Sequence, residues 1–258
     1  MRRETGAIRT VDLLGIFWRS FFLQASWSYE RMQSLGFAFA LIPALRRLYG
    51  KGEEFSKRLA VHMEYFNTQP YFASFILGAA ARLEEDRARG DASADPSELK
   101  RTLMAPLGAL GDSFFWGAVK PLAAATAVAT LLSGVWWAPL LFLGLYNAAH
   151  VRFRWSLIAE GYRTRGDVVA LMNRHHFTRL ARLFKLMCLA IIGVVAGTFS
   201  KWGPWPADLP LPGVLLIAAT GLAGTTALLG LMQIGGTPLQ LMVGIAALCA
   251  GFAWGGIF

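Results

Sequence analysis

The stretch SFFWGAVKPLAAATAVATLLSGVWWAPLLFLGLYNAAH, residues 113–150, carries a single full charge, at Lys120. A second long stretch, 202–258, is charged only at Asp208. Each stretch exceeds the roughly 20 apolar residues that a membrane-spanning helix needs. Of the 258 residues in the chain, 55% are hydrophobic and only 16% are charged, whereas about a quarter are charged in soluble domains. The sequence therefore predicts an integral membrane protein.

The apolar runs predict a polytopic, all-α protein with about five transmembrane segments. We expect these segments at about 113–133, 135–149, 186–200, 213–232 and 238–257. The runs at 35–49 and 71–83 are too short to cross a bilayer as ordinary helices, so we interpret them as re-entrant or interfacial. The predicted organisation is an amphipathic and motif-rich region with an N-terminal amphipathic helix, 1–105, followed by a polytopic membrane region, 106–258.

The distribution of basic residues predicts the orientation in the membrane. Residues 152–185 contain eight arginines and lysines but only two acidic residues. Loops of this composition remain on the cytoplasmic side. Residues 82–101 mix both signs of charge with Gly, Ser and Pro, which is typical of a solvated linker on the same side. We therefore expect the N-terminus and 152–185 to be cytoplasmic and the C-terminus to lie outside, although the last apolar segment could instead be re-entrant.

The net charge of +9 does not by itself indicate nucleic-acid binding, because most of the excess flanks apolar segments. Cys188 and Cys249 sit inside apolar runs without partners at metal-ligand spacing. His175 and His176 lie in the basic segment without acidic partners at ligand spacing, so we expect them to be solvated. The sequence lacks GxSxG, HExxH and phosphate-binding glycine motifs. We expect no metal, no cofactor, no nucleic acid and no covalent catalysis.

The stretch NTQP, residues 67–70, interrupts the chain just before an apolar run. Gln69 precedes Pro70 and is pushed away from helical backbone angles, so the preceding helix is expected to end near Asn67. Such a break is tolerated at membrane depth only where it is buried in protein or faces water, and broken helices build substrate sites in many transporters. Two interpretations stay open: Asn67 and Thr68 line a polar cavity, or they cap the next helix.

Polar side chains also recur at helical spacing nearer the N-terminus. Gln24, Ser28 and Arg31 fall at i, i+4 and i+7, which would form one stripe of a helix, and Glu30 and Gln33 flank this stripe. The stripe could line a polar cavity, and side-chain amides suit sugars because each offers donors and an acceptor. It could equally be the solvated face of an interfacial helix.

The stretch MAPLGALGDSFFWG, residues 104–117, raises the same question. Pro106 and Gly111 are expected to loosen the backbone. Asp112 would then stand at the head of an apolar helix, where it could cap the helix or bind a hydroxyl-rich ligand. Lys120 lies eight residues into the apolar run, where an unpaired charge costs roughly 2.5–3.5 kcal/mol at mid-bilayer. The proline after Lys120 favours a kink.

Four motifs together resemble a known family. In chain order they are FWRSFFLQASWSYERMQSLGFAFALIPALRRLY, HMEYFNTQPYFASFILGAAARLEE, LMAPLGALGDSFFWGAVKP and LYNAAHVRFRWSLIAEGYRTRG. They resemble the IID component of the mannose/fructose/sorbose-type phosphoenolpyruvate-dependent sugar phosphotransferase system. The resemblance covers residues 10 to about 168 and, more loosely, the rest of the chain. One departure is Ala105, where family members usually have glycine.

This resemblance implies a multi-pass subunit of the bacterial cytoplasmic membrane that is not itself an enzyme. It would pair with a IIC membrane subunit, in trimers of IIC–IID pairs, to bind and translocate a hexose. Phosphate would reach the sugar through IIA and IIB, with IIB phosphorylating it on release. The alternative is a divergent, transport-incompetent relative that acts as a membrane scaffold or regulatory docking protein.

The resemblance and the side-chain chemistry together assign the sugar contacts. The expected substrate-binding residues are Gln24, Asn67, Thr68 and Asp112. The residues expected to support the site are Glu30, Arg31, Gln33, Pro70, Pro106, Gly111 and Lys120.

Overall fold

The computed structural model describes residues 7–199 and Gln240. Its elements are α1 Thr10–Ser20, α2 Ser34–Tyr49, α3 Glu53–Val61, α4 Ala73–Ala88, α5 Pro96–Gly111, the π-helix η1 Asp112–Val119, α6 Lys120–Leu132, α7 Ala138–Thr164, α8 Val168–His175 and α9 Phe177–Phe199. The all-α prediction is therefore confirmed for the described residues. The expected spans at 213–232 and 238–257 lie outside them, apart from Gln240.

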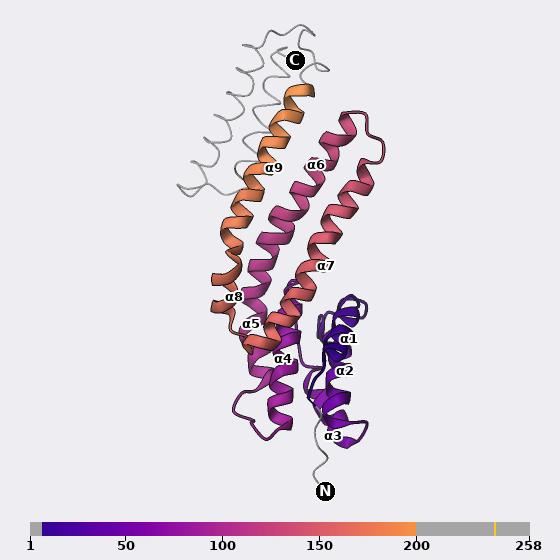
Figure 1. Ribbon diagram of the computed structural model, residues 1–258, viewed down its shortest axis with the longest axis vertical. Helices are drawn as coiled ribbons and strands as arrows, with labels where there is room; N and C mark the ends of the chain where they lie inside the picture. Colours follow the sequence, from indigo (N-terminus) through magenta and orange to yellow (C-terminus); the bar gives the residue numbers. More distant parts are fainter. Residues whose placement is uncertain (1–6, 200–239, 241–258) are drawn as a thin grey trace. The chain divides into compact units, whose positions relative to one another are not determined.

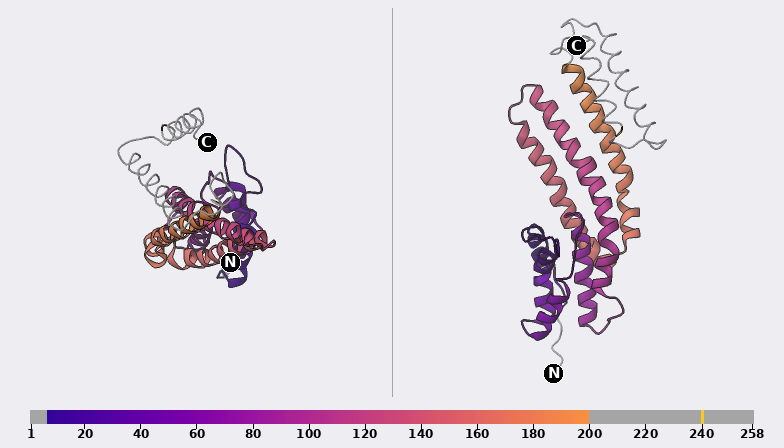
Figure 2. Two further views of the ribbon diagram at one scale, coloured as in Figure 1. Left: turned by 90° about the horizontal axis from the view of Figure 1, so that it is seen from above. Right: turned by 180° about the vertical axis from the view of Figure 1, so that it is seen from behind.

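The chain divides into two compact units, Met1–Cys188 and Leu189–Phe258, and the site lies within the first. In this unit α6 and α7 form a long helical hairpin, while α1 to α4 gather beside the start of α5 (Figures 1 and 2). The boundary expected near residue 105 falls inside α5. The division into a motif-rich region, 1–105, and a polytopic membrane region, 106–258, stays a prediction.

One continuous helical run, Pro96–Leu132, joins α5, η1 and α6. Among the described residues it is the helix that is long and apolar enough to cross a membrane. The number of spans stays a prediction. The run begins at the N-cap Asp95, whose Oδ1 accepts a hydrogen bond from the Ser97 amide at 3.3 Å. Asp112 is thus inside the helix, and the expectation that it caps a new helix is wrong.

The expected breaks at 104–117 do not form. Pro106 stands within α5, and Gly111 is followed directly by η1. Pro121 has no amide hydrogen for the Gly117 carbonyl, which therefore loses its α-helical donor. The wider turns of η1 lie just before Pro121. The helix therefore accommodates Pro121 by widening locally at η1, and it continues into α6.

The segment predicted as a solvated linker, 82–101, is mostly helical. α4 continues to Ala88 and α5 begins at Pro96, so only 89–95 form the connection. The three acidic residues on α4, Glu84, Glu85 and Asp86, are buried because they find partners. Asp86, for example, forms ion pairs with Arg82 at 3.2 Å and with Arg165 at 3.0 Å. These contacts to α4 itself and to the end of α7 could not be read from local composition.

The polar stripe expected on one N-terminal helix is also wrong. α1 ends at Ser20 and α2 begins at Ser34, so Gln24, Ser28 and Arg31 lie in the connection between them. The connection folds back onto α2 at Gly36, where an added Cβ would lie 2.0 Å from the Leu23 carbonyl oxygen. A continuous helix could not make this contact. Whether α1 lies at a membrane interface stays a prediction.

Two glycines bring α4 and α7 into close contact. A Cβ added at Gly78 would lie 2.1 Å from the Ile158 carbonyl oxygen, and one added at Gly161 would lie 2.0 Å from the Phe75 carbonyl oxygen. The two backbones are thus in direct contact, as at other helix crossings built on small residues. The crossing fixes the start of α4, and with it the break that precedes α4.

Gly161→Ala is therefore expected to destabilise the chain by about 1–3 kcal/mol, the usual range for overpacking. The measurement is thermal unfolding of the purified chain in detergent. Gly144→Ala is the matched control, because Gly144 is on the same helix with no atom within 4 Å of an added Cβ. A melting temperature lowered equally by both substitutions would contradict the assigned role of the crossing.

Candidate functional site

A cavity of about 640 Å³ lies beside the break between α3 and α4. All four expected sugar-contacting residues line it, and they come from three separate parts of the chain: Gln24, Asn67, Thr68 and Asp112. The other lining residues are Gln33, Tyr65, Gln69, Pro70, Met104, Ala105, Gly108, Ala109 and Trp116. Most of its polar groups are uncharged, and Asp112 is the one ionisable acid or base of this lining apart from the Tyr65 phenol.

The break itself is longer than predicted. α3 ends at Val61, not near Asn67, and α4 starts at Ala73. Between α3 and α4 the backbone pairs with the α1–α2 connection: the backbone N–H of Gln33 donates to the Phe66 carbonyl oxygen at 2.8 Å. This pairing of extended backbone replaces the helical hydrogen bonds that the break gives up.

Gln33 holds the break in place through its side chain. Its Nε2 donates to the Thr68 carbonyl oxygen at 2.8 Å, and its Oε1 accepts from the Thr68 amide at 3.1 Å. Only 2% of Gln33 is exposed, so both bonds are shielded from water. Gln33 therefore fixes the backbone at Thr68 by two direct hydrogen bonds.

Gln69, rather than Asn67 or Thr68, stabilises the turn that leads into α4. Its Oε1 accepts hydrogen bonds from the Tyr71 and Phe72 amides at 2.8 and 3.0 Å. The same bonds fix the amide so that Nε2 faces away from these donors. Among the described residues, Gln69 Nε2 and Thr68 Oγ1 are buried and find no hydrogen-bond partner, although both residues line the cavity. Buried polar groups without partners favour a ligand or water at this place.

Gly111 brings Asp112 to the break. A Cβ at Gly111 would lie 2.6 Å from the Gln69 Cβ, so only glycine permits α5 to approach this closely. Trp116 lies one turn beyond Asp112 on the same face and also lines the cavity. The Lys120 ammonium lies 5.0 Å from the centroid of the Trp116 ring, which gives it a cation–π partner.

The remaining expected supporting residues differ in their surroundings. Glu30 and Arg31 are exposed in the α1–α2 connection, and within residues 7–199 their side chains make no ion pair. The Arg31 backbone does contribute, since its carbonyl oxygen accepts from the Phe66 amide at 3.4 Å. Pro70 lines the cavity, whereas Pro106 is exposed on α5. The supporting roles of these residues stay predictions.

A buried cluster around Glu84 connects α2, α3 and α4, and the sequence pattern did not reveal it. Glu84 accepts hydrogen bonds from Tyr49 Oη at 2.8 Å, Arg58 Nε at 3.0 Å and His62 Nε2 at 2.8 Å. Burial alone would raise the pKa of Glu84, but the hydrogen bonds from His62 and Arg58 outweigh it and lower the pKa to about 2. Burial lowers the pKa of His62, so a neutral imidazole donates to a carboxylate here.

His175 is not a solvated surface residue, contrary to expectation. Its Nε2 lies 2.6 Å from Glu160 Oε2, because the turn between α7 and α8 returns α8 to the end of α7. His176 is exposed, as expected. Within residues 7–199 and 240, no group of three His, Cys, Asp or Glu residues could hold a metal ion.

The fold and the comparisons with known proteins place this chain among the helical membrane transport proteins. The structure is similar to a solved structure of the mannose transporter ManYZ in complex with microcin E492, with a TM-score of 0.59 and 33% identity over 96% of this chain and 98% of that one. It is also similar to a structure described as a membrane protein, with a TM-score of 0.72 and 33% identity over 97% of this chain and 98% of that one.

More particularly, the chain belongs to the family of IID components. The profile of the PTS system mannose/fructose/sorbose family IID component matches residues 7–203. The chain is 36% identical to the mannose-specific EIID component of Escherichia coli K12, over 94% of this chain and 83% of that protein. It is 34% identical to the sorbose-specific EIID component of Klebsiella pneumoniae, over 77% and 72% respectively. The resemblance in the motifs is thereby confirmed, and the chain is a membrane component of a sugar phosphotransferase system.

Proposed function

We propose that the chain pairs with a IIC subunit in the bacterial inner membrane, and that the pair binds and translocates a hexose. The observation that carries this proposal is the shared cavity of Gln24, Asn67, Thr68 and Asp112. Amides and hydroxyls donate and accept hydrogen bonds, and a carboxylate accepts them. Together they match the hydroxyl groups of a sugar, each of which is both donor and acceptor.

The free groups of the cavity define how the sugar binds. Gln69 Nε2 and Thr68 Oγ1, which have no partner in the described part of the chain, donate to sugar oxygens. Asp112 accepts from sugar hydroxyls, and the Trp116 ring supplies an apolar surface beside them. Gln33 contributes through Thr68, whose backbone it fixes. Because the cavity is open, the IIC subunit completes the remaining contacts.

The chain carries no phosphate in this proposal. Phosphate passes through IIA to IIB, and IIB phosphorylates the sugar when it is released inside. The assembly is a trimer of IIC–IID pairs. The N-terminus and 152–185 face the cytoplasm, because the basic residues concentrate there. Residues 1–105 supply most of the sugar contacts, and 106–258 supply most of the passage through the membrane.

Transport is favoured over the scaffold alternative by the extent of the similarity. The match to the mannose-specific relative covers 94% of this chain, and polar side chains of this chain line a cavity. A scaffold needs neither a cavity nor buried donors that face it. Uptake of labelled sugar by the chain with its IIC, IIA and IIB partners separates the two functions.

Asn67→Ala is expected to reduce uptake of labelled hexose roughly five- to tenfold, since one net hydrogen bond contributes about 1 kcal/mol. Asn67 is exposed in the cavity, so its truncation leaves no buried group without a partner in the protein. Membrane insertion and co-purification with IIC should therefore be unchanged. The matched control is Asn173→Ala, which removes an exposed amide from α8. Uptake at the wild-type level in the Asn67 variant would refute the assignment of this residue.

A further inference from the structure

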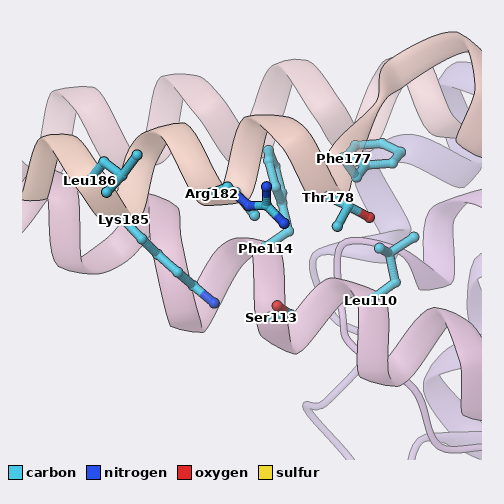
Figure 3. Close-up of a pocket in the computed structure, with 9 residues that line it drawn as sticks. Leu110, Ser113, Phe114, Phe177, Thr178, Arg182, Lys185 and Leu186 are labelled. Carbon is cyan, nitrogen blue, oxygen red and sulfur yellow. The ribbon is translucent and has the colours of Figure 1, made fainter. Parts of the chain in front are cut away.

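A second cavity, of about 280 Å³, lies between α9 and the α5–η1 run, away from the polar cavity (Figure 3). Thr178, Arg182 and Lys185 line it from α9, where their spacing of i, i+4 and i+7 puts them on one face. Ser113 lines it from η1. Lys185 reaches toward η1 (Figure 3), where its Nζ would lie 3.7 Å from a Cβ added at Gly117.

We call this second cavity the basic groove. Its two cations, Arg182 and Lys185, have no anionic partner among the described residues. Within residues 7–199 and 240, neither Arg182 nor Lys185 forms an ion pair or a side-chain hydrogen bond, whereas several other basic residues of the first unit do, for example Arg58 and Arg165. Both side chains are exposed.

The walls of the groove are apolar. Phe114, which is fully buried, forms its floor, and Leu186 and Leu110 border it. A soluble anion needs only the cations and hydroxyls, whereas an amphiphile also needs an apolar surface for its chains. The groove offers both at the junction between the basic segment, 152–185, and the apolar part of α9.

We propose that this groove binds the phosphate group of an anionic phospholipid. Arg182 and Lys185 contact the phosphate, Ser113 and Thr178 donate hydrogen bonds to its oxygens, and an acyl chain lies against Leu110 and Leu186. Basic pockets between helices near the cytoplasmic surface bind lipid head groups in this way. The bound lipid would join α9 to η1 in place of a direct ion pair.

The test is titration of the purified full-length chain, in neutral detergent, with dioleoyl phosphatidylglycerol, followed by native mass spectrometry. The double variant R182Q/K185Q is expected to weaken binding roughly tenfold, since each basic residue near an anionic lipid contributes a several-fold factor. Dioleoyl phosphatidylcholine, which has the same chains, should bind equally weakly to both proteins.

The matched control is R152Q/R179Q, which removes the same charge from two exposed arginines that do not line the groove. An equal loss of affinity in both double variants would overturn the proposal in favour of diffuse attraction. Ser113→Trp keeps every charge but fills the groove, so it should also weaken binding, and undiminished binding would contradict the site. If inorganic phosphate or glucose 6-phosphate displaced the lipid at millimolar concentration, the proposal would be overturned, and the ligand of the groove would be a soluble phosphate.

Discussion

Asp112→Ala is expected to weaken sugar binding roughly 10- to 150-fold, because hydrogen bonds to a charged group contribute about 1.5–3 kcal/mol. Asp112 lies within the continuous helix from Pro96 to Leu132 and is exposed in the cavity. Its removal therefore disturbs neither a helix cap nor a buried ion pair. The effect should appear as a raised apparent KM for uptake, with unchanged amounts of the chain in the membrane.

Two further variants make this prediction specific. Asp112→Asn keeps an acceptor but loses the charge, so it should fall between wild type and Asp112→Ala. Asp91→Ala removes an exposed carboxylate from the 89–95 connection, far from the cavity residues in sequence, and should leave uptake unaffected. If Asp112→Ala retained a wild-type KM, Asp112 would not contact the sugar, and the proposed chemistry of the cavity would have to be abandoned.

Glu84→Ala is expected to destabilise the chain by about 3–5 kcal/mol, the usual result of removing one partner from a buried ion pair. Glu84 is fully buried, and its removal leaves Arg58 and His62 without their acceptor. Thermal unfolding in detergent measures the effect. The control is Glu53→Ala, which breaks an exposed pair with Lys57 and should change stability by about 1 kcal/mol or less.

The same cluster predicts acid sensitivity. The pKa of Glu84 falls from its ordinary value of 4.5 to about 2, so the unfolded chain binds the proton more readily than the folded one. Its stabilising contribution is complete above about pH 4.5 and is lost as the pH falls toward 2. In Glu84→Gln this part of the pH dependence should disappear, whereas an unchanged acid transition would assign it to other groups.

Composition and motif chemistry predicted much of this protein. The charge-poor stretches predicted helices of a membrane protein, and Pro70 marked the break beside the cavity. The four polar residues assigned to the sugar line one cavity because Gly111 and Gln33 bring their segments together. That convergence followed from motif resemblance, since nothing in local spacing joins Gln24 to Asp112.

Errors arose where long-range contacts override local pattern. The spacing of Gln24, Ser28 and Arg31 is helical, yet contact of Leu23 with Gly36 excludes a helix there. Glu84 looked solvated because its partners Tyr49, Arg58 and His62 lie 22 to 35 residues away in sequence. The role of Gln69 in the turn before α4 was missed, since Ser, Thr, Asp and Asn are the usual N-cap residues. The longer Gln69 side chain accepts from the Tyr71 and Phe72 backbone amides, which lie just before α4.

The glycine contact between α4 and α7 limits how this subunit can change shape. At Gly78 and Gly161 each helix packs against a backbone carbonyl of the other, with no room for a Cβ. Sliding of one helix along the other would bring larger residues into this contact, so we expect little shear motion between them. We expect the two helices to move as one rigid body when the subunit changes conformation. We therefore expect a displacement at the end of α7 to move α4 as well, and with it the NTQP segment that precedes α4.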